Sequence, residues 1–207
     1  MKTLTLAAIR CSLMFTAVTS LFCVQPAQAY TVTLEQIGSN VVATGSGPIN
    51  LTGLTLSFPG AISGAVVFAS VGQIETGPAS ALVDGYTGFA GPTSFGSSEF
   101  LFLADASRGN SVAISGLMEI LVVPVGYVSG NVLSNSMTFN NATLASLGVT
   151  PGTYVWTWGT GLANQNFTLQ IGSVGVPPPG VPDGGSTFSL LGCALLGLAA
   201  LRRKLSC

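Results

Sequence analysis

The middle of the chain begins with Thr31-Val-Thr-Leu-Glu35, continues through Gly38-Ser-Asn40 and runs into Val41-Val-Ala-Thr44. Polar and apolar residues alternate in the first of these segments, which is typical of a strand with one buried face. Glycine and asparagine then supply the backbone conformations that a tight turn requires. The whole stretch therefore predicts a β-hairpin.

Short segments of the same kind recur along the chain, separated by turns rich in glycine and proline. Further strands are predicted at 49–58, 64–69, 99–104, 111–115, 117–123, 136–139, 153–158 and 167–171. The apolar phase changes at Gly53, which predicts a β-bulge there. Residues 72–98 have the weakest pattern and are expected to form loops. Helical periodicity is limited to one or two turns at 141–148, so we predict an all-β fold, an antiparallel β-sandwich or jelly roll.

Charged residues are scarce in this chain. The chain has 207 residues, 48% of them hydrophobic, with 27 glycines and only 13 charged side chains. Residues 30–176 contain six acids and a single base, Arg108, which gives a net charge of −5. This balance argues against nucleic acid as a partner. The four cysteines lie at positions 11, 23, 193 and 207, so core burial rather than disulfides must stabilise the region between them.

The amino terminus has the three-part pattern of a secretory signal peptide. Lys2 and Arg10 precede an apolar run over 11–24, and the small residues Ala27 and Ala29 follow at the spacing that signal peptidase requires. We therefore predict a signal peptide at 1–29, cleaved by signal peptidase after Ala29, and an exported β-sandwich domain at 30–173. An uncleaved membrane anchor is the alternative.

The carboxyl terminus has a second tripartite pattern. A Pro/Gly linker at 174–180 leads to Val181-Pro-Asp-Gly-Gly185, an uncharged run and finally Arg202-Arg-Lys204. Moving each of the three cations across a bilayer would cost about 2.5–3.5 kcal/mol, so they remain cytoplasmic and stop the transfer of the chain. We predict a single transmembrane helix at about 186–201, followed by a basic tail. A buried helix of a soluble domain also fits this length.

The order of turn motif, apolar run and basic cluster resembles the PEP-CTERM class of bacterial sorting signals, most closely the VPDSG-CTERM variant, with Gly184 in place of the serine. The resemblance implies that 181–207 is a sorting signal, with its motif at Val181, Pro182, Asp183, Gly184 and Gly185 and its membrane stop at Arg202, Arg203 and Lys204. It further implies processing by an exosortase-type membrane protease and delivery to the cell surface or extracellular matrix. Residues 147–159 and 167–172 also resemble the closing strands of secreted PEP-CTERM proteins, whose function is largely unassigned.

Few residues offer catalytic chemistry. The chain has no histidine, which excludes His-based triads and most transition-metal sites, and the predicted exported domain has no cysteine nucleophile. We therefore predict no catalytic residue, no metal, no cofactor and no enzymatic activity. Two of the six acids acting as a carboxylate glycosidase pair form the least favoured alternative.

Tyr154, Trp156 and Trp158 occupy alternate positions and therefore project from one face of a strand. Such a row either packs inside a sandwich or stacks on sugar rings. The first arrangement is the more favoured, because the region has few other large side chains to fill a core. The expected function is thus an exported cell-surface or extracellular-matrix protein, first anchored in the membrane by its tail. A carbohydrate-binding module with exopolysaccharide as its partner is the alternative.

Overall fold

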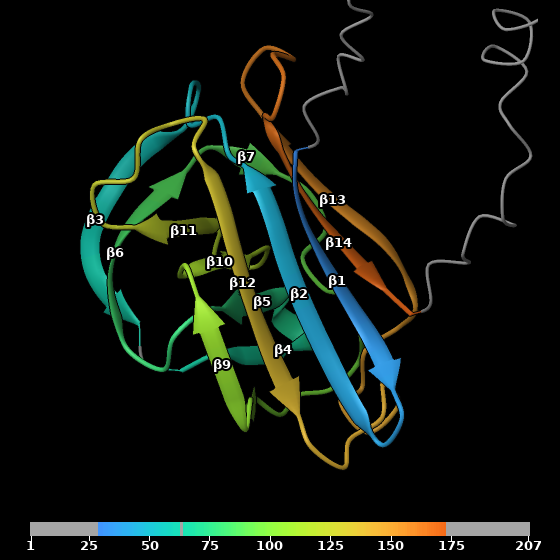
Figure 1. Cartoon of the computed structure of the whole chain (residues 1–207). Helices are drawn as coiled ribbons and strands as arrows, with labels where there is room; N and C mark the ends of the chain where they lie inside the picture. The colour runs from blue at the N-terminus through green and yellow to red at the C-terminus, as the bar shows by residue number, and fades with distance from the viewer. Residues whose placement is uncertain (1–28, 63, 173–207) are drawn as a thin grey trace, which may run out of the picture.

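The computed structural model describes residues 29–62 and 64–172, which form two seven-stranded β-sheets (Figure 1). The only helical element in these ranges is a single 3₁₀ turn at Ala69–Val71. The predicted all-β class is therefore confirmed. Within the same ranges, no helix has the length and apolar character needed to cross a membrane. The predicted signal peptide up to residue 28, the linker at 174–180 and the helix at 186–201 lie outside the described residues.

Each sheet collects strands from distant parts of the chain. Sheet A has the order β7 (Phe89–Ala90), β13 (Gly152–Trp158), β14 (Asn166–Ile171), β1 (Tyr30–Ile37), β2 (Asn40–Pro48), β12 (Val132–Phe139) and β9 (Ala106–Gly109). Sheet B has the order β3 (Thr55–Ile62), β6 (Ala81–Thr87), β11 (Ile120–Pro124), β10 (Val112–Ser115), β5 (Gln73–Thr76), β4 (Val66–Phe68) and β8 (Phe102–Leu103).

The predicted hairpin is β1 and β2, which pair antiparallel from Thr31 opposite Ser46 to Ile37 opposite Asn40. Gly38 takes a φ of +62° in the turn between them, a conformation that glycine adopts without steric cost. Apolar residues at alternate positions, such as Val32, Leu34 and Val41, are fully buried, while the threonines between them point outward. Val42, half-buried on the outward face, and Ile37, exposed at the end of the hairpin, depart from this pattern. The period-two pattern of the sequence thus sets the faces of the central hairpin.

One pairing departs from the predicted antiparallel arrangement. Strands β1 and β14 run parallel, with Tyr30 opposite Phe167 and Leu34 opposite Ile171. The first and last strands of the described domain are therefore neighbours at the middle of sheet A. Local patterns report the faces of a strand but not its partner, so this pairing is set by the packing of the whole domain.

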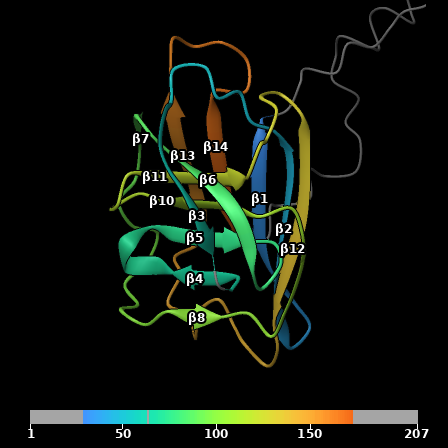
Figure 2. The same cartoon turned by 90° about the vertical axis from the view of Figure 1, so that its left-hand side faces the viewer.

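The two sheets share one hydrophobic core. Figure 2 shows β4, β5 and β10 running across the direction of β1, β2 and β12. The largest fully buried side chains between the sheets include Trp156, Tyr30, Phe95 and Phe167. Phe167 contacts both Tyr30 and Trp156, with ring centroids 5.2 and 5.7 Å apart. Full burial of such side chains contributes about 1.5–3 kcal/mol each, so this aromatic cluster is a main source of stability.

A second, smaller cluster lies on the other face of sheet B. It consists of Val83 from β6, Ala113 from β10 and Val122 from β11, with Ile62 and Ile120 packed against it. Figure 2 shows β3 and β6 passing in front of β10 and β11. The paired strands β3 and β6 therefore cover part of the outer surface of their own sheet.

The bulge predicted at Gly53 is wrong in its position. Gly53 lies in a turn before β3 with a φ of +93°, and a Cβ atom there would come within 2.6 Å of Gly159 Cα. The register shift instead lies between Leu56 and Phe58, where β3 pairs with β6. The change of apolar phase at Gly53 therefore coincides with a close approach of its turn to the loop at Gly159, which is far away in sequence.

Two other local predictions also differ from the structure. Residues 72–98, expected to form loops, contain β5, β6 and β7. Strand β5 was not predicted because it lacks the alternation of a strand with one exposed face. Its residues Ile74, Glu75 and Thr76 are all buried, so both faces of the strand are covered. Residues 141–148 form turns and no helix, although one helix-like hydrogen bond runs from the Leu147 N–H to the Thr143 carbonyl at 3.1 Å.

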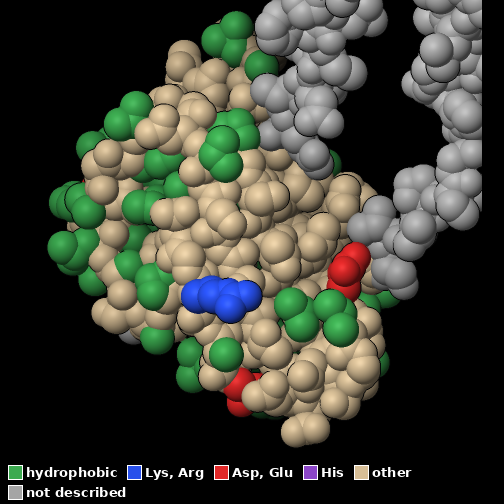
Figure 3. Space-filling view, in the orientation of Figure 1, with side chains coloured by type: hydrophobic (Ala, Val, Ile, Leu, Met, Phe, Trp, Pro, Cys, Tyr) green, Lys and Arg blue, Asp and Glu red, His purple; other side chains and the backbone are tan. Residues whose placement is uncertain are grey.

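The outer face of sheet A is polar and nearly uncharged. Figure 3 views this face and shows few charged groups among side chains of other types, while hydrophobic side chains gather toward the β3–β6 side of the molecule. The outward residues of β1, β2 and β12 are mainly threonine and serine.

Candidate functional site

The predicted sorting residues lie outside the described part of the chain. These are Val181, Pro182, Asp183, Gly184 and Gly185 of the motif and Arg202, Arg203 and Lys204 of the basic cluster. Ala27 of the predicted cleavage site is also outside it. Ala29 is the first described residue and directly precedes β1, so the predicted cleavage point coincides with the start of the β-structure.

The predicted aromatic row on β13 faces inward. Trp156 is fully buried and Trp158 is 6% exposed. The Trp156 indole N–H donates to the Pro92 carbonyl at 2.8 Å, and that of Trp158 donates to the Asn50 carbonyl at 2.7 Å. Both polar edges are thus satisfied internally.

Tyr154 is half-buried against the same core. Its ring meets Phe95 edge-on at 5.9 Å, and its hydroxyl donates to the Thr150 carbonyl at 3.0 Å. Packing inside the sandwich is therefore the arrangement that the structure shows for this row, and no flat platform of three rings is presented to a sugar.

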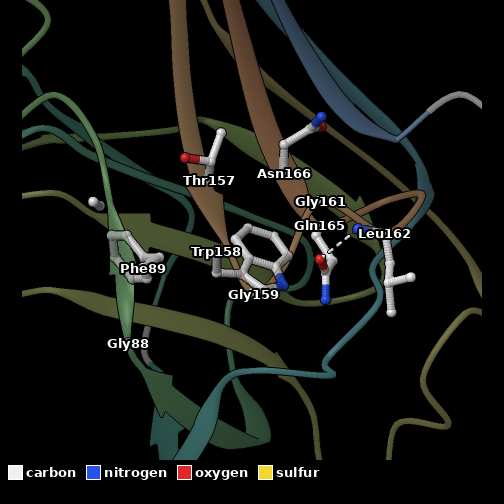
Figure 4. Close-up of a pocket in the computed structure, with 10 residues that line it drawn as sticks. Gly88, Phe89, Thr157, Trp158, Gly159, Gly161, Leu162, Gln165 and Asn166 are labelled. Carbon is white, nitrogen blue, oxygen red and sulfur yellow. Dashed lines mark hydrogen bonds between the residues drawn. The ribbon is translucent and has the colours of Figure 1, made fainter.

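Beside Trp158 the surface is hollowed into an open depression of about 630 Å³ (Figure 4). Its walls come from β7, from the ends of β13 and β14, and from the loop that joins those two strands. The lining includes Phe89, Thr157, Trp158, Leu162, Gln165 and Asn166.

Gln165 holds the β13–β14 loop in shape. Its side-chain oxygen accepts from the Thr160 N–H at 3.0 Å and from the Leu162 N–H at 2.8 Å, the latter drawn in Figure 4. Its amide nitrogen donates to the Thr52 carbonyl at 2.6 Å. Because these bonds use both ends of the buried amide, Gln165 supports the depression and has little capacity left for a ligand.

The chemistry of this depression is that of a neutral binding surface. The side chains that line it carry no charge, and they include no pair of a nucleophile and a base. Asn166 Oδ1 is buried without a hydrogen-bond partner, but an atom closed to water is also closed to a ligand. Leu162, 54% exposed, adds an apolar rim.

Among the six acids, Glu75 has the most perturbed environment. Its side chain is 7% exposed, and burial raises its pKa to about 7, partly offset by a hydrogen bond with Gln73. Glu75 Oε1 has no hydrogen-bond partner, and its register neighbours are Val66 and Ala113. Among residues 29–62 and 64–172, no three acidic, cysteine or histidine side chains gather into a potential metal site.

Two other carboxylates accept hydrogen bonds from backbone N–H groups of turns. Asp84 Oδ2 accepts from the Gly126 N–H at 2.9 Å, and Asp105 Oδ2 accepts from the Asn140 N–H at 2.7 Å. These bonds give both carboxylates a structural role in connecting loops.

Sequence reasoning missed the depression and its residues. Gln165, Asn166 and Leu162 follow a glycine-containing turn in the segment Gly159-Thr-Gly-Leu-Ala-Asn-Gln-Asn166. Three amide side chains within this short connection between two strands were the available signal, since amides often bind the backbone of tight loops.

Comparison with known families identifies the tail. Residues 180–205 match the VPDSG-CTERM motif model, so the chain ends in a sorting signal of the PEP-CTERM type. A tail of this kind implies processing by exosortase-type machinery and export toward the cell surface. Comparison of the chain with curated proteins and with solved structures gives no match.

Proposed function

We propose that this chain is an exported cell-surface or extracellular-matrix protein that displays a non-catalytic β-sandwich domain. The match of residues 180–205 to the sorting motif carries this proposal. Signal peptidase releases the amino terminus after Ala29, and the apolar run at 186–201 anchors the chain in the membrane. Arg202, Arg203 and Lys204 hold the end of that run on the cytoplasmic side.

An exosortase-type protease then cuts near Val181–Gly185 and passes the domain to the surface.

The chemistry of the described domain supports a display role. Its buried tryptophans support the core, and two of its carboxylates support turns.

The test uses the full-length chain expressed in a bacterium that contains an exosortase of this type. The wild-type protein should lose its tail and appear in the surface or matrix fraction. A variant with Pro182→Ala and Asp183→Ala should retain the tail and remain with the inner membrane. Pro178→Ala and Pro179→Ala, in the adjacent linker, provide the matched control and should behave as wild type. Identical mass and identical fractionation of the motif variant and the wild type would contradict the proposal.

Carbohydrate binding is the second candidate function. With Trp156 and Trp158 packed inside, ring stacking on β13 does not support it. The observation in its favour is the wide hydroxyl-bearing face of sheet A, which offers donors and acceptors to a polyhydroxylated partner.

A further inference from the structure

The outer face of sheet A carries a registered row of polar side chains across six strands. From β13 to β9 the row consists of Thr153, Gln170, Thr33, Thr44, Ser136 and Arg108, each directly opposite the next. All six side chains are exposed or half-buried. The parallel row through Thr31 adds Thr168, Ser46 and Ser134. Neighbouring strands lie about 4.7–4.9 Å apart, so the rows form a closely spaced array of hydroxyl and amide groups.

The row ends in a small groove at Arg108. This groove has a volume of about 240 Å³ and is lined by residues of β2, β9 and β12. Beside Arg108 these are the hydroxyl-bearing Thr44, Ser107, Ser136 and Thr138 and the apolar Val42 and Ala106. Arg108 Nε donates to Ser136 Oγ at 3.0 Å, which holds the guanidinium group at the groove wall. The two terminal nitrogens of the guanidinium group remain for a ligand, because a guanidinium group has five N–H donors in all.

Arg108 is the only lysine or arginine in residues 29–172, so it is the only basic side chain there that an anionic ligand can contact. Its only side-chain hydrogen bond within the described ranges is the bond to a neutral serine. The guanidinium group of such an arginine can donate two parallel hydrogen bonds to the two oxygens of a carboxylate, a geometry that matches its planar shape. The groove therefore suits a ligand with a single negative charge at Arg108, hydroxyl groups that meet the threonines and serines, and carbon atoms that meet Val42 and Ala106.

The surroundings narrow the class of partner. A lipid or an apolar protein surface would cover the hydroxyl rows without satisfying them, which is unfavourable. A nucleic acid requires several cations for its phosphates, whereas this region has one. A sugar polymer with carboxylate groups meets both requirements, because its hydroxyls match the rows and its carboxylate matches Arg108.

We propose that the groove at Arg108 binds the carboxylate of an acidic sugar unit, with adjoining units of the polysaccharide lying along the Thr44 and Ser136 row. This proposal deepens the second candidate function and does not depend on processing of the tail. The depression beside Trp158 is the weaker site, since the Trp158 ring is 6% exposed and Gln165 is already bonded. Each unit binds weakly and the polymer binds through many units, because an exposed ion pair contributes little alone.

The test titrates the full-length chain in detergent micelles with oligogalacturonate, its methyl ester and dextran oligosaccharides. Oligogalacturonate should bind saturably, and Arg108→Gln should weaken that binding about two- to fivefold, as expected for the loss of one exposed ion pair. Arg108→Lys should fall between the two, because it keeps the charge and loses the planar contact. Glu119→Gln, on an exposed turn of sheet B, is the control and should bind as wild type.

Equal binding by wild type and Arg108→Gln would overturn the proposal, as would equal binding of the acid and its methyl ester. Binding of dextran alone would overturn the Arg108 site and leave carbohydrate binding as a function. Failure of all three ligands would overturn both. None of these results bears on the tail, whose processing is measured separately by mass and fractionation.

Discussion

Asn135 Nδ2 donates a 2.7 Å hydrogen bond to the hydroxyl group of Tyr30, and both side chains are buried. Tyr30 begins β1 and directly follows the predicted cleavage point, whereas Asn135 lies on β12, two strands away in sheet A. Gly45 on the intervening strand makes room for this contact, because a Cβ atom there would overlap both polar groups. Burial raises the pKa of Tyr30 to about 12, so the hydroxyl that accepts from Asn135 carries no charge at neutral pH.

Tyr30→Phe should lower the free energy of unfolding by about 1–3 kcal/mol, since it leaves a buried amide hydrogen without its partner. Urea denaturation of the purified chain measures this change. Tyr154→Phe is the control, because its hydroxyl bonds the Thr150 carbonyl near solvent, and it should cost less than about 1 kcal/mol. Equal losses in the two variants would show that the buried Tyr30–Asn135 hydrogen bond stabilises the fold no more than the exposed one at Tyr154.

Gly116→Ala should strongly destabilise the domain. A Cβ atom at Gly116 would overlap the Pro92 carbonyl oxygen, which accepts the Trp156 indole N–H, and would lie 3.0 Å from that nitrogen. Overpacking of this kind costs about 1–3 kcal/mol. Thermal unfolding followed by tryptophan fluorescence measures it. Gly152→Ala, whose nearest new contact would be 3.5 Å away, should change the midpoint little, and a similar drop in both variants would refute this account.

Stability should fall as the pH rises from about 4.5 to about 7. Burial raises the pKa of Glu75 to about 7 in the folded protein, so in this window the unfolded chain loses its proton more readily than the folded one. The loss should reach about 1–3 kcal/mol above pH 7 and be absent below the unfolded pKa. Urea denaturation at a series of pH values tests this. Glu75→Gln should flatten the profile, whereas Glu119→Gln should not, and an unchanged slope in Glu75→Gln would exclude Glu75 as the cause.

Ala29→Leu should block removal of the signal peptide, because signal peptidase requires small residues at the positions of Ala27 and Ala29. Intact-mass measurement of the membrane-associated product should then show the full amino-terminal extension. Gln28→Leu is the matched control, since the position between the two alanines tolerates a large side chain. An exported product that begins at Tyr30 in spite of Ala29→Leu would place the cleavage elsewhere.

Local patterns predicted the parts of the fold whose evidence is contiguous. The alternation in Thr31–Glu35 and the glycine turn at Gly38 identified the β1–β2 hairpin, and the alternate spacing of Tyr154, Trp156 and Trp158 placed the three rings on one face. The same approach failed at β5, where burial on both faces removes the alternation. At Gly53 it detected an irregularity and misassigned its cause.

The amino-acid sequence by itself determined the β class, the faces of the main strands and the identity of the tail at 180–205, because each depends on neighbouring residues. Only the tertiary structure decided that β1 pairs in parallel with β14, that the tryptophans of β13 fill the core, and that Arg108 meets Thr44 and Ser136 in one groove. These contacts join residues far apart along the chain, and their partners are selected by the packing of two whole sheets, which no local pattern records.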